Sequence, residues 1–221
     1  AYNDHSGPGQ LQRLLGLVAE GRSLAYASEA GTPRISDPDF ELARAVAAAG
    51  LPLTAAPGPC AAIAALTLSG LPSDRFLFAG FLPAAASARR AALEELAPVQ
   101  ATLILYESHK RLAAFLADAA RVLGETRGAA ICRELTKRFE EVTRGTLAEL
   151  AATLAERELK GEIVVLIDRA PPEAVSEEKI AAALDAALAR MSVKDAATFV
   201  SQDLKVARKI AYRIALARQQ E

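Results

Sequence analysis

The chain has 221 residues, 52% of them hydrophobic, and a formal net charge of −1. This length holds one large domain or two to three small ones, and the near-neutral charge excludes a generally basic coat for nucleic acid. Cys60 and Cys132 are too few and too far apart for a disulfide framework, and no clustered Cys/His spacing predicts a metal site. No apolar run reaches membrane-spanning length and the polar residues 1–5 precede no apolar signal segment, so we expect a cytoplasmic protein without a membrane span.

In the first third of the chain, two short apolar segments each precede a loop rich in glycine and proline. We expect strands over 22–27 and 51–55, and helices over 8–20, over 38–49 and from the second loop to Ser69. Because the carboxyl ends of parallel strands meet at one sheet edge, the loops 28–38 and 57–62 could line one cleft. Such a cleft suits a nucleoside or an adenine-bearing cofactor; the alternative is two ordinary βα turns. Neither loop carries a lysine or a glycine-rich phosphate motif, which disfavours a phosphate site.

The middle of the chain follows the polar connector 70–75, our first candidate domain boundary. Apolar and β-branched runs predict strands over 76–81, 101–106, 128–133 and 162–168, with 139–143 as the hairpin partner of the third. Helices are expected over 87–97, 109–123 and 146–159, the last of them opened by a capping box of Thr146 and Glu149.

The adjacent prolines at 171–172 mark the second candidate boundary. Three helices are expected beyond it, over 176–190, 192–203 and 205–219, and the second has a capping-box pattern from Ser192 to Asp195. A short second helix, a tight turn and a longer third helix resemble a helix-turn-helix. Positive charge on or near the third helix comes from Lys205, Arg208, Lys209 and Arg213. These side chains either contact nucleic acid or form the solvated face of a small bundle, and charge alone does not decide.

Several charged residues have a structural and a functional interpretation. Glu29 either binds a hydroxyl pair or acts as a base, or it is a solvated loop carboxylate. The segment 106–111 follows a strand at the edge where ligand loops gather. The segment 133–138 mixes charges at a turn, and forms either a surface salt-bridge cluster or a rim that faces an anion.

A set of motifs in a fixed order resembles one known family. Residues 28–38, SEAGTPRISDP, look like the signature SDAGTPxISDPG, and residues 57–62 look like a PGPxA loop. Further matching blocks lie at 70–76, 80–83, 106–112, 133–137 and 160–162. The sequence therefore resembles the small-subunit ribosomal RNA cytidine-2′-O-methyltransferase branch of the tetrapyrrole-methylase-like superfamily, over nearly the whole chain.

The resemblance implies two α/β domains of the tetrapyrrole methylase (class III methyltransferase) type with S-adenosylmethionine in the cleft between them, and a small helical domain that helps to grip RNA. The expected domains are 1–72, 73–169 and 173–221. The expected partners are small-subunit (16S) rRNA or the assembled 30S subunit and a second copy in a homodimer, with no metal. Expected cofactor contacts are Glu29, Ala30, Gly31, Thr32, Pro57, Gly58, Cys60, Ala61, Tyr106, Arg133 and Glu162; candidate bases are Glu107 and Glu134; expected RNA contacts are Arg89, Arg90, Lys110, Arg111, Lys205, Arg208, Lys209 and Arg213.

The sequence also departs from the family pattern. Glu29 replaces the aspartate of the signature and Asp39 replaces a glycine. The family's opening βα segment, with its TPIGN loop and EDTR motif, does not appear, so we expect an N-terminal portion to be missing. Two alternatives stay open: a precorrin-type tetrapyrrole methyltransferase, which the blocks around Pro72 and Glu107 weigh against, and a non-catalytic nucleic-acid-binding helix-turn-helix protein.

Overall fold

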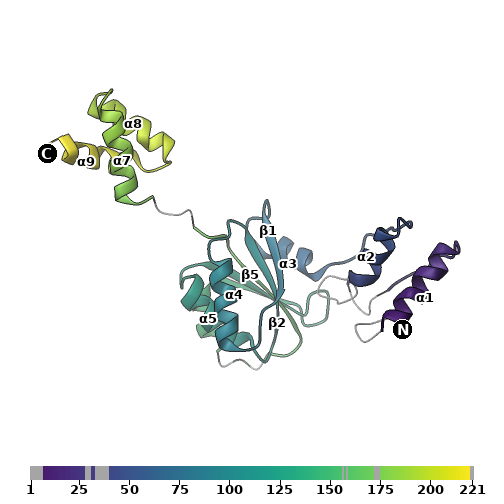
Figure 1. Cartoon of the computed structure of the whole chain (residues 1–221). Helices are drawn as coiled ribbons and strands as arrows, with labels where there is room; N and C mark the ends of the chain where they lie inside the picture. The colour runs from purple at the N-terminus through teal and green to yellow at the C-terminus, as the bar shows by residue number, and fades with distance from the viewer. Residues whose placement is uncertain are drawn as a thin grey trace. The chain divides into compact units, whose positions relative to one another are not determined.

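The computed structural model describes residues 7–27, 31–32, 40–155, 157, 159–171 and 175–219. The chain divides into two compact units, Ala1–Ala170 and Pro171–Glu221 (Figure 1). No helix in the described ranges is long and apolar enough to cross a membrane.

A five-stranded mixed sheet forms the centre of the first unit, in the order β1-β2-β5-β3-β4. Its strands are β1 (Phe76–Phe81), β2 (Thr102–Ser108), β3 (Gly128–Arg133), β4 (Glu141–Thr146) and β5 (Glu162–Ile167). β1 and β2 are parallel, and every other neighbouring pair is antiparallel. The carboxyl ends of β1, β2 and β3 therefore meet the amino ends of β4 and β5 at one edge, which we call the functional edge.

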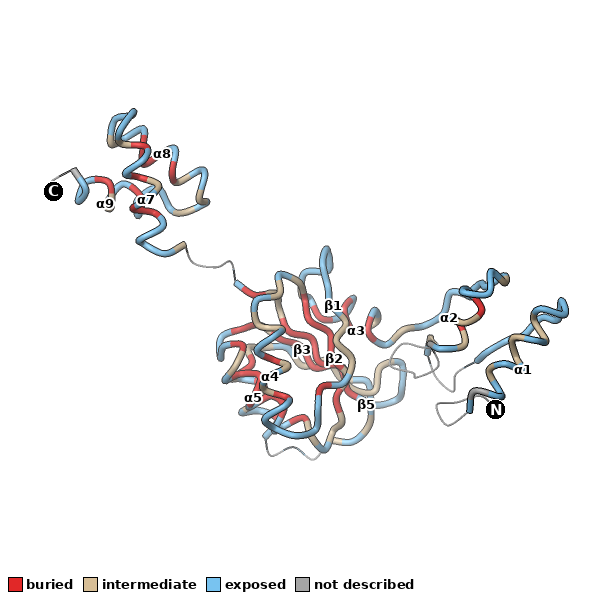
Figure 2. The backbone as a smooth tube through the Cα atoms, viewed as in Figure 1, coloured by how far each residue is buried: buried red, intermediate tan, exposed pale blue. Residues whose placement is uncertain are grey.

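Helices cover the two faces of this sheet unequally. α4 (Ala86–Leu96), α5 (Leu112–Leu123) and α6 (Leu147–Leu154) pack on one face, the three-helix face, where Leu103 and Leu105 of β2 are fully buried. α3 (Ala61–Ser69) packs on the other, the α3 face, against Ile104. Figure 2 shows the buried residues concentrated in the strands and on the inner sides of these helices. Successive side chains of a strand point to opposite faces, so position along β2 decides which helices a residue meets.

Arginine 144 of β4 holds the end of α3 on the sheet. Its Nε donates to the Ser69 carbonyl at 3.0 Å, and its Nη2 donates to the Leu68 carbonyl. These are two of the last carbonyls of α3, which have no partner within the helix, and a cation there also opposes the helix dipole.

Replacing Arg144 by methionine is expected to lower the free energy of unfolding by about 1–2 kcal/mol, because two charge-assisted hydrogen bonds are lost. Urea denaturation measures the change. The matched control is Arg75→Met, which removes an exposed arginine of the same unit and is expected to change stability by less than about 0.5 kcal/mol. Equal effects of the two substitutions would contradict a role of Arg144 in holding α3.

The strands expected over 22–27 and 51–55 are not formed, and that prediction is wrong. Both segments are exposed, with Leu24 and Leu53 at 44% and 55% exposure. A strand is stabilised by hydrogen bonds to a neighbour, and the described sheet takes up neither segment. The helices expected around them are confirmed as α1 (Pro8–Ala19), α2 (Phe40–Ala48) and α3, and α1 contacts α2.

The second unit consists of α7 (Glu177–Leu188), α8 (Val193–Asp203) and α9 (Arg208–Gln219), as expected. Its core is made mainly of small and aliphatic residues: Ile180, Leu184, Ala187, Ala196, Ala197, Val200, Ala211 and Ala215. The Ser192 hydroxyl accepts from the Asp195 amide at 3.2 Å and donates to the Asp195 carboxylate at 2.6 Å. At Thr146 and Glu149 both reciprocal bonds of the capping box are present. At Ser192 the Asp195 carboxylate bonds the Ser192 hydroxyl, because Asp195 is one methylene shorter than glutamate.

Candidate functional site

Two of the predicted cofactor loops touch each other although their strands are not formed. The Thr32 hydroxyl donates to the Pro59 carbonyl at 2.9 Å, with the Gly58 carbonyl at 3.4 Å. Gly31 has φ +70°, a left-handed conformation that favours glycine. Glu29 and Ala30 lie outside the described residues. The contact brings Thr32 to the loop that immediately precedes α3.

The start of α3 has backbone donors that no side-chain cap at Cys60 satisfies. Cys60 is the N-cap, with extended backbone angles, and makes no side-chain capping bond. The first amide groups of a helix have no intrahelical partner, so they are available to a ligand or to a neighbouring side chain. Pro57, Gly58 and Ala61 are exposed and Cys60 is half-buried.

Tyr106 of β2 lies beside the start of α3. Burial raises the pKa of the Tyr106 hydroxyl above its ordinary value of 10.0, the nearby Cys60 thiol adds to the shift, and a hydrogen bond from the Ala62 amide opposes it. The hydroxyl therefore stays protonated near neutral pH. Its ring makes edge contacts with Phe78 and Phe81 of β1, with centroids 4.9 and 5.7 Å apart, and Phe81 is 57% exposed. These three rings form an aromatic wall next to the α3 amides.

A charged cluster occupies the functional edge between β3 and β5. Oε1 of Glu134 accepts from the Glu162 amide at 2.9 Å and from Lys137 Nζ at 3.0 Å, and Lys137 also pairs with the Glu162 carboxylate at 3.1 Å. The amide hydrogen bond and then Lys137 hold the pKa of Glu134 below its ordinary value. Adjacent residues of a strand point to opposite faces, and Ile163 points to the three-helix face, so Glu162 points to the α3 face. The charge of Glu162 contributes to the raised pKa of Tyr106.

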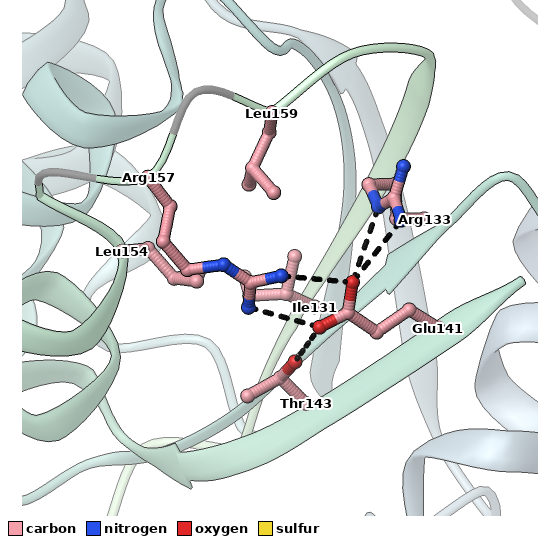
Figure 3. A pocket seen from close by; sticks show the side chains of 7 residues that line it. All are labelled: Ile131, Arg133, Glu141, Thr143, Leu154, Arg157 and Leu159. Atoms are coloured by element: carbon pink, nitrogen blue, oxygen red, sulfur yellow. Dashed lines mark hydrogen bonds and ion pairs between the residues drawn. The ribbon is translucent and has the colours of Figure 1, made fainter. Parts of the chain in front are cut away.

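Glu107 and Arg133 lie on the opposite face of the sheet from Tyr106. Glu107 is 3% exposed, and its Oε1 accepts from Arg111 Nε at 2.7 Å and from the Ser108 amide at 2.6 Å. Figure 3 shows Glu141 between the guanidinium groups of Arg133 and Arg157, on the three-helix face. The structure therefore does not bring Glu107 or Arg133 together with the α3 loops.

A comparison with protein families decides what this arrangement belongs to. Residues 10–151 match the model of the family Tetrapyrrole (Corrin/Porphyrin) Methylases. The chain belongs to this family. The matched segment includes both loops, the aromatic wall, and Glu134 and Lys137 of the charged cluster, so the expected tetrapyrrole methylase fold is confirmed.

Relatives of this tetrapyrrole methylase carry the name "Ribosomal RNA small subunit methyltransferase I". The Xylella fastidiosa protein is 49% identical over 77% of this chain and 63% of its own length. The Escherichia coli O157:H7 protein is 39% identical over 99% of this chain and 78% of its own length. The chain thus spans somewhat less than two thirds of the length of the Xylella relative. Among solved structures, the methyltransferase CobJ has a TM-score of 0.56 at 20% identity, covering 79% of this chain and 76% of CobJ, which is a likeness of fold.

The arginines and lysines expected to contact RNA differ in how exposed they are and in whether an acidic side chain holds them. Arg89 is 5% exposed, and its Nε and Nη2 donate to the Asp118 carboxylate at 2.9 and 2.6 Å. A buried, paired guanidinium cannot reach a phosphate, so the prediction for Arg89 is wrong. Arg90 is only partly exposed and shares Asp118, and Arg111 is held by Glu107. The exposed side chains are Lys110, Lys205, Arg208, Lys209 and Arg213, of which Arg213 pairs with Glu177 at 2.6 Å.

The chemical groups of the described residues are of the types that bind S-adenosylmethionine. The amides at the start of α3 other than that of Ala62 can meet an acceptor such as a carboxylate or an adenine nitrogen. The aromatic wall offers apolar area for adenine and a ring face for the positive sulfonium. Sequence reasoning missed Phe78 and Phe81, although 76–81 is the most aromatic stretch of the chain. Within the described ranges, no group of three or more His, Cys, Asp or Glu side chains is arranged to hold a metal ion.

Proposed function

We propose that this chain is the S-adenosylmethionine-dependent methyltransferase that methylates the ribose 2′-hydroxyl of a cytidine in small-subunit rRNA. The observation that carries the proposal is the 39% identity to the E. coli ribosomal RNA small subunit methyltransferase I over 99% of this chain. The choice of cytidine as the nucleotide and of the 2′-hydroxyl as the acceptor rests on the resemblance of the sequence motifs to that branch of the family. Such a substrate would place the protein in the cytoplasm, working on free rRNA or on the 30S subunit.

S-adenosylmethionine, when bound, supplies an electrophilic methyl group on its sulfonium. We propose that Gly31, Thr32, Gly58, Cys60, Ala61 and Tyr106 hold it, together with Glu29, Ala30 and Pro57 of the same loops. The α3 amides orient the polar end, and the aromatic wall excludes water from the sulfonium side. Most of the rate enhancement of an in-line displacement comes from aligning the reacting atoms, so these residues act mainly by positioning.

Between the two candidate bases, the geometry favours Glu134 over Glu107. Glu134 lies at the functional edge with Glu162, whereas Glu107 is buried on the three-helix face against Arg111. The lowered pKa of Glu134 keeps it ionised but makes it a weak base. We propose that Glu134 receives the ribose proton and that Arg133 and Glu107 act only by supporting the fold.

The proposed domain plan is an N-terminal domain over 1–72 that carries the cofactor loops, an α/β domain over 73–169 and an RNA-binding helical domain over 173–221. We further propose that two copies form a homodimer, as the sequence motifs imply. Size-exclusion chromatography with light scattering measures the mass of the 221-residue chain, and a monomer at micromolar concentration would contradict the dimer.

Calorimetric titration of the chain with S-adenosylmethionine tests the cofactor site. Micromolar binding is expected for the wild type. Tyr106→Ala is expected to weaken binding about 10-fold or more, because the ring is removed from the aromatic wall. The control Phe139→Ala removes another exposed ring and is expected to change the affinity less than twofold. Unchanged binding by Tyr106→Ala would contradict the assigned site.

Transfer of a labelled methyl group tests the substrate. The label is expected in small-subunit rRNA, at a position that resists alkaline cleavage, because alkaline cleavage needs a free 2′-hydroxyl. Tyr106→Ala and Glu134→Gln are expected to lower the rate, Glu134→Gln without a change in S-adenosylmethionine affinity. Methylation of a tetrapyrrole but not of the RNA would instead favour the precorrin-type alternative.

A further inference from the structure

A basic groove with one aromatic side chain lies at the starts of α8 and α9. It is lined by Lys194 of α8 and by Arg208, Lys209 and Tyr212 of α9. The three cationic side chains are exposed, with Lys194 in the first turn of α8, and Tyr212 is 40% exposed. Residues three and four apart lie on one side of a helix, so Arg208 and Lys209 share a face of α9 with Tyr212. We call these four residues the α8–α9 groove.

The positive charges of this groove have no acidic partner among the described residues of the helical unit. α9 carries four arginines and lysines and no acidic residue. The later two are paired, Arg213 with Glu177 at 2.6 Å and Arg218 with Asp185 at 3.3 Å. Among the described residues, no carboxylate lies at ion-pair distance from Lys194, Arg208 or Lys209. Asp195, the acid next to Lys194, is engaged by the Ser192 hydroxyl at 2.6 Å.

One of the groove cations is also held in place. Arg208 Nε donates to the Thr198 hydroxyl at 3.0 Å, and that hydroxyl in turn donates to the Lys194 carbonyl at 2.8 Å. This chain of bonds connects the start of α9 to the first turns of α8. The Arg208 guanidinium therefore keeps its position with its remaining N–H donors available to an anion.

Tyr212 contributes little to the core of its own unit. The core contacts of α9 are made by Ala211 and Ala215, both with no exposed surface, and by Ile214, whereas Tyr212 is not part of that core. A ring left partly exposed among unpaired cations has the composition of single-stranded nucleic-acid sites, in which bases stack on aromatic side chains and cations follow the backbone. In an RNA duplex the bases are paired and stacked on one another, so the ring would find no free base face.

We propose that the α8–α9 groove binds single-stranded RNA, with one nucleobase stacked on Tyr212 and the adjoining phosphates held by Lys194, Arg208 and Lys209. This inference deepens the proposed function and rests on its RNA substrate. It assigns the helical unit a preference for an unpaired nucleotide. An acidic peptide would satisfy the cations but would not need the ring, and it enters below as an outcome of the test.

Fluorescence anisotropy of the full chain with a labelled 12-nucleotide oligoribonucleotide, alone and annealed to its complement, tests the groove. Tyr212→Ala is expected to weaken single-strand binding about 5- to 150-fold while leaving the salt dependence unchanged. Lys209→Ala is expected to reduce the slope of log affinity against log salt by about 0.7. The matched controls are Phe199→Ala, an exposed ring of α8 outside the groove lining, and Lys179→Ala on α7; both are expected to change the affinity less than twofold.

Tyr212→Trp adds a direct readout, because the chain contains no tryptophan. The fluorescence of this single tryptophan is expected to be quenched by the single strand, and not by poly-aspartate at the same ionic strength. Unchanged affinity of Tyr212→Ala, equal binding of duplex and single strand, or equal binding of poly-aspartate would each overturn the proposal.

Thermal unfolding of each variant shows whether the helical unit still folds. Tyr212→Phe keeps the ring and is expected to retain the wild-type affinity for the single strand. Titration of the same proteins with S-adenosylmethionine separates the two proposals. A chain that fails to bind S-adenosylmethionine but keeps Tyr212-dependent RNA binding would overturn the proposed function alone. The reverse result would overturn only the groove.

Discussion

Replacing Asp118 by alanine is expected to lower the free energy of unfolding of the Ala1–Ala170 unit by about 3–5 kcal/mol, because it leaves the buried Arg89 guanidinium without its counter-ion. Arg89 of α4 and Asp118 of α5 are 5% and 7% exposed, and the pair joins the two helices at 2.6 Å. Urea denaturation followed by circular dichroism measures the loss.

The charges around Asp118 provide a matched control. Arg121 also pairs with Asp118, at 2.9 Å, but its side chain is 63% exposed. Arg121→Ala is expected to change stability by at most about 1 kcal/mol, because an exposed ion pair is screened by water. The double variant Arg89→Met with Asp118→Leu removes both charges and is expected to be more stable than Asp118→Ala alone. Equal effects of Asp118→Ala and Arg121→Ala would contradict the buried pair.

The Asp118 carboxylate is also expected to make the free energy of unfolding depend on pH. Burial alone would raise the pKa of Asp118, but the hydrogen bonds and charges of Arg89 and Arg90 outweigh it and hold the pKa below the ordinary 3.8. A group with a lowered pKa stabilises the folded state above its unfolded-state pKa and loses that contribution as the pH falls through its folded-state pKa. The stability difference between the wild type and Asp118→Ala is therefore expected to be constant near neutral pH and to shrink below about pH 4.

The Arg89–Arg90 pair shows what the sequence could not specify. Both arginines occur in one amphipathic helix, and a basic pair looks the same whether it meets solvent or core. The Arg89 side chain points into the protein because it pairs with Asp118, which is 29 residues further along the chain. A contact between two helices is a tertiary property, whereas helix periodicity is local. The helices and the five strands of the sheet were predictable because their signals are local.

Two errors in the site have different physical origins. The strands expected over 22–27 and 51–55 failed because an apolar run becomes a strand only beside another strand. Glu107 and Tyr106 were expected in one site, but they are adjacent in a strand. Adjacent residues of a strand point to opposite faces, so the sequence already argues against that expectation. The sequence did bring the loops 28–38 and 57–62 to one cleft, and the hydrogen bond of Thr32 to Pro59 joins them, although the strands expected before them are not formed.

Replacing Gly161 by alanine is expected to destabilise the chain more than replacing Gly124 by alanine, although both glycines have positive φ angles, +97° and +106°. Backbone strain of about 1–3 kcal/mol applies at either position. A Cβ at Gly124 would meet nothing within 4 Å, whereas a Cβ at Gly161 would lie 2.3–2.5 Å from Oε1, Cδ and Cγ of Glu134. The Glu134 side chain would have to leave the Glu162 amide and Lys137, so its loss adds to the strain.

A double-mutant cycle separates this collision from the strain. Glu134→Ala removes all three atoms that a Cβ at Gly161 would meet. In the Gly161→Ala background, Glu134→Ala is therefore expected to be nearly neutral, although it destabilises the wild type by removing the bonds to Glu162 and Lys137. Additive effects in the cycle, measured by urea denaturation, would mean that Glu134 does not pack against Gly161. Because Glu162 is the next residue and lies on the face of Tyr106, the strength of this coupling also reports how firmly the turn holds the charged cluster beside the proposed cofactor site.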